Sequence, residues 1–151
     1  MSEILQKLES LDESLPEAPE HVANYLGCKR TGSLLFVSAR VSEARGEVGI
    51  DLNLEQAQTA AKDTALLLLA IVKNEIGDLD QIKGVVKMNG FVRSSIDFTR
   101  QPLVIDGASG LLIALWGDEG KHARTATGTS QLPFGAAIQL EMILELKETQ
   151  G

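Results

Sequence analysis

Cysteine is scarce in this sequence, and long apolar runs are absent. Its 151 residues include one cysteine, Cys28, which excludes a disulfide within the chain and fits a reducing compartment. The longest apolar run covers residues 65–72 and is too short to span a bilayer, and the acidic, polar N-terminus does not resemble a signal peptide. We therefore expect a cytoplasmic protein that does not associate with a membrane.

Basic and aromatic residues are scarce as well. Lys and Arg number 14 against 21 Asp and Glu, so the formal net charge is −7, and aromatic residues make up only 4% of the chain. Affinity for nucleic acids rests largely on cationic side chains that meet phosphates and on aromatic rings that stack on bases. We therefore expect no nucleic-acid partner.

Two long helices are predicted from capping residues and apolar spacing. Asn53, with Gln56 three residues later, forms a capping box for a helix that ends near Ile76, just before Gly77. Residues 101–116 carry helical spacing again, with a proline suited to the first turn.

The length of the chain fits a single domain, residues 1–151, that is large enough for a real core. Residues 1–20 are predicted to form a short helix capped by Ser2, followed by a flexible extension.

The clearest strand pattern lies at 136–146, where apolar and mostly polar residues alternate with the period of a half-buried strand. The element order strand, strand, helix, strand, helix, strand, strand predicts an α+β fold, with a mixed β-sheet and two main helices packed on one face. The other face of the sheet is half apolar, which in a soluble protein usually indicates contact with another subunit. The remaining strands are predicted at residues 25–30, 33–41, 84–93 and 123–128.

The last two strands contain the first candidate site. Arg124 stands alone in a nearly uncharged run, and Glu141 lies on the polar side of the final strand. A guanidinium can hold a carboxylate through two parallel hydrogen bonds, and a carboxylate can orient a water molecule or move its proton. If these two strands pair or lie close together, Arg124 and Glu141 face one site.

Several segments resemble the Rid family, also called YjgF, of imine and enamine deaminases. They are Tyr25, LLFVSA at 34–39, KMNGFVRSSIDF at 87–98, and above all HARTATGTSQLPFGAAIQLEMILEL at 122–146, where the family shows an Ala-Arg step, then Leu-Pro, then an alternating strand with an acid. The long segment at 97–124, DFTRQPLVIDGASGLLIALWGDEGKHAR, is similar to a YjgF-like branch of that family.

The resemblance implies a chorismate-mutase-like fold and a homotrimer, with the sheets packed into a central barrel and active clefts between subunits. It also implies a small-molecule substrate. Members of the family hydrolyse 2-imino acids and enamines such as 2-aminoacrylate to 2-keto acids and ammonia, without a metal or an organic cofactor.

The same resemblance assigns roles to residues of this chain. Arg124 anchors the substrate carboxylate, and Glu141 positions the attacking water. Tyr25 and Ser38 offer polar contacts, and the main chain at Ala126 faces the substrate. The structural alternatives are an arginine paired to an acid, a solvated glutamate and a packing tyrosine.

Four residues depart from the family pattern. They bear on which substrates the protein accepts more than on the role of Arg124 as the carboxylate anchor. They are Ala39 for a common glycine, Ile96 for asparagine, His122 for proline and Ala126 for cysteine. His122 is interpreted as a surface histidine, His21 receives no role, and Cys28 is interpreted as a small packing residue.

Two other functions remain open. A non-catalytic trimer would use the same arginine to bind 2-keto acids or similar carboxylates. An RNA-cleaving or translation-inhibiting protein is the third hypothesis, and the acidic balance of the chain counts against it.

Overall fold

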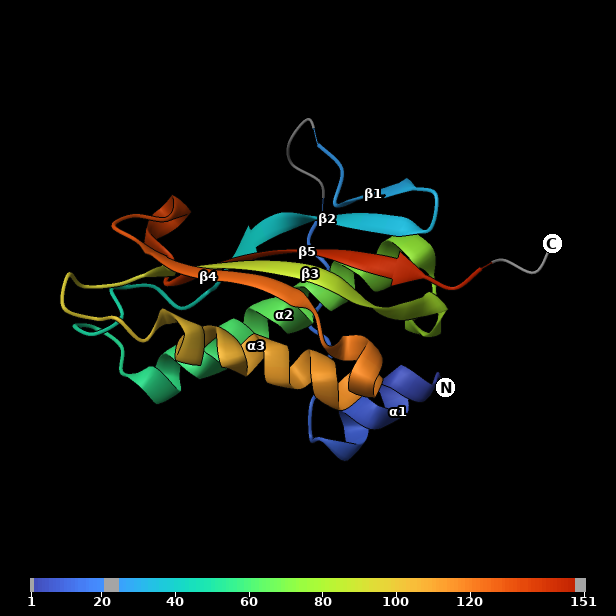
Figure 1. Ribbon diagram of the computed structural model, residues 1–151, viewed down its shortest axis with the longest axis horizontal. Helices are drawn as coiled ribbons and strands as arrows, with labels where there is room; N and C mark the ends of the chain where they lie inside the picture. The colour runs from blue at the N-terminus through green and yellow to red at the C-terminus, as the bar shows by residue number, and fades with distance from the viewer. Residues whose placement is uncertain (1, 21–24, 149–151) are drawn as a thin grey trace.

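A five-stranded sheet with two long helices across one face forms the body of the protein in the computed structural model, which describes residues 2–20 and 25–148 (Figure 1). His21 lies outside the described residues. Within those ranges, every helix is too short or too polar to cross a bilayer. The elements are α1 Glu3–Ser10, β1 Cys28–Thr31, β2 Leu34–Val41, α2 Leu54–Ile76, η1 Leu79–Gln81, β3 Ile82–Arg93, α3 Gln101–Trp116, η2 Gly117–Gly120, β4 Ala123–Thr129, η3 Pro133–Gly135 and β5 Ile138–Leu146.

Helix α2 begins and ends where its sequence predicts. The Asn53 side chain accepts a hydrogen bond from the Gln56 backbone N–H at 2.8 Å, and the Gln56 side chain accepts one from the Asn53 N–H at 2.9 Å. Gly77 ends the helix with a φ of 89°, a conformation that costs glycine little. Against α2 lies Gly107 of α3, where an added Cβ would sit 2.2 Å from the Gln58 carbonyl oxygen, so the two helices pack in backbone contact.

Strand β5 lies at the centre of the sheet, whose order is β1-β2-β5-β3-β4. Strands β3 and β4 are parallel and the other pairs are antiparallel, so the sheet is mixed. The predicted α+β architecture, with two main helices on one face, is therefore confirmed. The side of β5 that faces the helices is buried throughout and consists of Ile138, Leu140, Met142, Leu144 and Leu146.

The last two strands do not pair with each other, because β3 lies between them. This overturns the pairing considered for β4 and β5 from the sequence. Strand β4 follows α3 and lies parallel to β3 at the edge of the sheet, which is the arrangement of a strand–helix–strand crossover. The fully apolar inner side of β5 instead requires a central position covered by helices.

The N-terminal helix α1 is held by a carboxylate from a distant part of the chain. Asp80 in η1 accepts hydrogen bonds from the backbone N–H groups of Glu3 at 2.8 Å and Ile4 at 3.0 Å. Burial raises the pKa of Asp80, but the N–H groups of Ile4 and Glu3 and the side chain of Ser2 lower it more, so the net pKa is below its usual value. Ile4 and Leu8 are buried, so this contact fixes a helix that contributes to the core.

We expect Asp80→Asn to lower the free energy of unfolding by about 1 kcal/mol at pH 7, because an uncharged amide accepts the two N–H groups less well. A carboxyl whose pKa is lowered in the folded state stabilises the protein above the unfolded-state pKa near ~3.9, and this stabilisation is lost as the pH falls through the folded-state pKa. The difference between variant and wild type should therefore disappear in acid, which urea unfolding at several pH values measures. Asp97→Asn, at an exposed acid, is the control; a pH-independent difference for Asp80→Asn would contradict the assignment.

Candidate functional site

Arg124 lies on β4, on the side of the sheet that faces α3. Its Nη1 donates to Asp106 Oδ1 at 2.7 Å and to Ser109 Oγ at 3.2 Å, and its Nη2 donates to the Pro102 carbonyl oxygen at 3.4 Å. The side chain of Arg124 is 24% exposed and that of Asp106 is 52% exposed. The guanidinium is thus fixed against α3 and still reaches the surface at the outer strand of the sheet.

His122 extends this series of hydrogen bonds. Ser109 Oγ lies 3.0 Å from Nε2 of His122, and Nδ1 of His122 lies 2.6 Å from the Gly120 carbonyl oxygen. Ser109 is 7% exposed, and the His122 ring is half-buried. The expectation of a surface histidine is therefore wrong, because the ring lies between α3 and the start of β4 with partners at both nitrogens.

Sequence reasoning missed Asp106 and Ser109 altogether. The two residues are three apart on α3, a spacing that places side chains on the same face of a helix. His122 and Arg124 are two apart at the start of β4, and such residues lie on the same side of a strand. These two spacings were the available signal, but the sequence did not show that the helix face and the strand side meet.

Glu141 belongs to a different place, a hollow of about 290 Å³ on the sheet face away from the helices. Asn89 Nδ2 donates to Glu141 Oε1 at 3.2 Å from the neighbouring strand β3. Ser38, Lys29 and Lys87 also line this hollow, together with apolar residues such as Phe36 and Ile143. The structure therefore brings Glu141 and Ser38 together and adds Lys29, Lys87 and Asn89, to which the sequence assigned no role.

The side chain of Ser38 bonds to the segment before β1 that contains Tyr25. The Ser38 hydroxyl donates to the Leu26 carbonyl oxygen at 2.6 Å, and Tyr25, next to Leu26, is 47% exposed. The predicted strand at 25–30 begins only at Cys28. Ala39 lies where the pairing of β2 with β5 shifts register, the kind of irregularity at which glycine is often found.

Arg124 and Glu141 do not face one site within a single chain. Arg124 is aligned with Met88 on β3, whereas Glu141 is aligned with Asn89, the next residue. Successive residues of a strand point to opposite faces, so the two side chains lie on opposite faces of the sheet. Ala126 is aligned with Gly90 and thus shares the face of Arg124.

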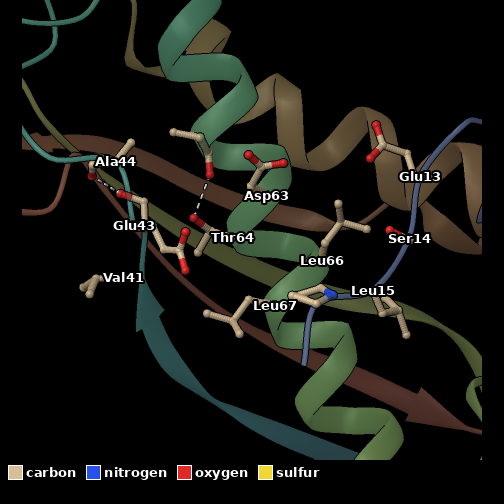
Figure 2. A pocket seen from close by; sticks show the side chains of 13 residues that line it. Glu13, Ser14, Leu15, Val41, Glu43, Ala44, Asp63, Thr64, Leu66 and Leu67 are labelled. Atoms are coloured by element: carbon tan, nitrogen blue, oxygen red, sulfur yellow. Dashed lines mark hydrogen bonds between the residues drawn. The ribbon is translucent and has the colours of Figure 1, made fainter. Parts of the chain in front are cut away.

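A separate groove of about 390 Å³ lies between residues 13–16, α2 and the chain after β2 (Figure 2). Three acidic residues, Glu13, Glu43 and Asp63, line it together with aliphatic side chains, and Glu13 is paired with Lys62. The residues predicted for the site lie elsewhere. In the part of the chain that the structure describes, no group of three or more His, Cys, Asp and Glu side chains could hold a metal ion.

Cys28 is buried at the start of β1. It does not line the hollow that holds Glu141, and it does not contact Arg124. Burial, and secondly the charge of Glu75, raise the pKa of its thiol to about 12. A thiol with such a raised pKa is protonated at neutral pH, and a protonated thiol is a poor nucleophile. The interpretation of Cys28 as a packing residue agrees with its buried position.

Comparison with known proteins gives consistent matches. The family model described as "YjgF/chorismate mutase-like, putative endoribonuclease" matches residues 7–146. Protein TCP17 of Trypanosoma cruzi is 38% identical over 150 residues, which cover 95% of this chain and 94% of that protein. The crystal structure of protein Atu1372 from Agrobacterium tumefaciens has a TM-score of 0.89 and 39% identity, with coverage of 96% of this chain and 93% of the other.

The crystal structure of RidA from an Antarctic Psychrobacter has a TM-score of 0.57 and 21% identity, with coverage of 86% of this chain and 94% of that chain. At that identity the similarity shows the fold alone. The extent of the family match and the identity to TCP17 show more: this chain belongs to the YjgF/chorismate-mutase-like family, which includes the Rid proteins.

Proposed function

We propose that the protein hydrolyses reactive 2-imino acids and their enamine tautomers, such as 2-aminoacrylate, to 2-keto acids and ammonia. The observation that carries the proposal is that Arg124 is held in place and is still partly exposed. Its guanidinium is held by Asp106 and Ser109 at the outer strand of the sheet, yet part of it is exposed. A cation held in this way suits a small anionic ligand such as a 2-imino carboxylate.

The positions of Arg124 and Glu141 support a site that two copies of the chain complete. Strand β4 would supply Arg124 and the main chain at Ala126. The sheet face of a neighbouring copy would supply Glu141, Ser38 and Tyr25. That face carries exposed apolar side chains, with Phe36 41% and Val86 40% exposed, as expected of a surface that meets another subunit. We propose a cyclic homotrimer, in which each copy uses both surfaces once.

The proposed reaction needs one water molecule and no redox step. Glu141 takes a proton from water as the oxygen bonds to the imine carbon, and the proton passes to the nitrogen. The carbon–nitrogen bond of the tetrahedral adduct then breaks, ammonia leaves, and loss of the hydroxyl proton yields the ketone. Because a protonated imine is already electrophilic, orientation and proton transfer are the main contributions required of the protein.

A carboxylate-binding protein without catalysis would use the same Arg124, and turnover measurements separate the two functions. The family description also names an endoribonuclease. The net charge of −7 is unfavourable for a chain that must approach a polyanion, so cleavage of RNA is the weaker proposal.

We expect Arg124→Ala to remove most of the deaminase activity while the protein stays folded. Loss of a charge-assisted carboxylate contact should lower kcat/KM by about 30- to 1000-fold. The pair with Asp106 is partly exposed, so its loss should cost about 1 kcal/mol of stability or less. Arg124→Lys should also be poor, because an ammonium cannot form the bidentate contact. Near wild-type release of ammonia from imines made in situ by an amino-acid oxidase would refute the role of Arg124.

The role of Glu141 is tested by Glu141→Gln, which keeps the size of the side chain but cannot accept a proton. We expect the catalytic rate to fall by about 10- to 1000-fold, with little change in the affinity for 2-oxobutyrate measured by calorimetry. Glu145→Gln is the matched control, because Glu145 lies on the same side of β5 and pairs with Lys83 at 3.4 Å. Equal turnover in all three proteins would remove Glu141 from the mechanism. A wild type that binds 2-oxobutyrate but shows no turnover above the spontaneous rate would leave the binding function.

The shared site is tested by mixing subunits. Sedimentation equilibrium should give a trimer at micromolar concentration. Arg124→Ala and Glu141→Gln should each be nearly inactive, but co-expression of the two chains should create clefts with an intact Arg124 from one copy and an intact Glu141 from the other. Random assembly gives about one quarter of the wild-type number of such clefts. A monomer, or mixed trimers with no recovered activity, would contradict the two-copy site.

A further inference from the structure

We propose that Ser109 and His122 are positioning residues that turn Arg124 so that the Nε and Nη2 edge of its guanidinium receives the ligand carboxylate. The inference rests on the proposed role of Arg124 as the carboxylate anchor. It adds two residues to the site and specifies which edge of the guanidinium meets the ligand.

The hydrogen atoms of the guanidinium decide which edge is available. Nη1 carries two hydrogens, and these are committed to Asp106 Oδ1 and Ser109 Oγ. Nη2 gives one hydrogen to the Pro102 carbonyl oxygen. Nε and the second hydrogen of Nη2 donate no hydrogen bond within the described part of the chain. A carboxylate that forms two parallel bonds without displacing a protein contact must therefore use Nε and Nη2.

The direction of donation along the chain follows from what each group can do. The Gly120 carbonyl can only accept, so Nδ1 of His122 carries a proton, and in the tautomer with this single ring proton Nε2 is an acceptor. Arg124 can only donate, so Ser109 Oγ accepts from Nη1 and gives its own proton to Nε2. The Nη1, Ser109 hydroxyl and His122 Nδ1 donors thus each have an acceptor, and the Ser109 hydroxyl is held in one orientation.

The Gly120 peptide and helix α3, which hold this series of hydrogen bonds, are both packed in the body of the fold. Gly120 is buried, and an added Cβ there would sit 2.4 Å from the Leu112 carbonyl oxygen, so its peptide is packed against α3. Helix α3 is itself in backbone contact with α2 at Gly107. The orientation of the guanidinium is thereby connected to the core, which reduces the conformational entropy that ligand binding must remove.

Loss of the Ser109 hydroxyl should affect binding more than chemistry. In Ser109→Ala, Nη1 loses one of its two acceptors and Nε2 of His122 loses its donor, so the guanidinium is held less firmly, by Asp106 and the Pro102 carbonyl oxygen. We expect 2-oxobutyrate to bind about 3- to 10-fold more weakly, which is the range for one lost hydrogen bond. KM should rise by a similar factor with kcat nearly unchanged, because the anchor holds substrate and transition state equally.

The edge assignment is tested by the NMR signal of the Arg124 Nε–H group, assigned by its loss in Arg124→Lys. Addition of 2-oxobutyrate to the wild type should shift this signal, because Nε becomes a donor to the carboxylate. In Ser109→Ala the signal should move less and the dissociation constant should rise. In His122→Gln, whose amide oxygen can accept the Ser109 hydroxyl, affinity should be closer to that of the wild type than in His122→Ala.

Thr64→Val is the control, because it removes a buried helix hydroxyl, bonded to the Ala60 carbonyl oxygen at 2.7 Å, that has no connection to Arg124. It should leave both the affinity and the Nε–H shift unchanged. If 2-oxobutyrate binds to the wild type without moving the Nε–H signal, or binds equally well to Ser109→Ala, this inference is wrong while the proposed function stands. If the wild type binds no 2-oxobutyrate, the arginine anchor fails and this inference fails with it.

Discussion

The burial of one side of β5 is the constraint on which the rest of the structure depends. Its five apolar residues need helices above them and strands on both sides, which places the last strand of the chain in the centre of the sheet. Helices α2 and α3 meet this need by lying in backbone contact over the same face. The opposite side of β5 then forms the floor of the hollow that holds Glu141, so a single alternating strand organises the core and supplies a candidate functional residue.

The central position of β5 also separates the two chemical groups. Because β5 and β3 lie inside the sheet, β4 is left at its edge, and Arg124 turns toward α3 rather than toward Glu141. Each group has its own supporting partner, Ser109 for the arginine and Asn89 for the carboxylate. Under the proposed function, the contact between subunits brings these two prepared halves together. The affinity for the carboxylate and the delivery of water are then set by different elements of the fold.

Features that depend on neighbouring residues were predictable from the sequence, and features that depend on how elements meet were not. The capping box at Asn53, the end of α2 at Gly77 and the alternation of β5 were predicted correctly because caps and periodicity are local. Strand order is decided by tertiary packing, and for that reason Arg124 and Glu141 were considered for one site in a single chain. His122 was misread for the same reason, since its partner Ser109 comes from α3.

The order of the strands has a consequence for how the chain folds. Until residue 146 has been synthesised, β2 and β3 lack the partner that joins them, and the apolar sides of α2 and α3 lack the strand they cover. An N-terminal fragment therefore presents two open strand edges and an uncovered core, both of which favour aggregation. Folding of the sheet must wait for the C-terminal strand to leave the ribosome and insert between strands made much earlier. Such non-local pairing makes folding slow for a chain of this length.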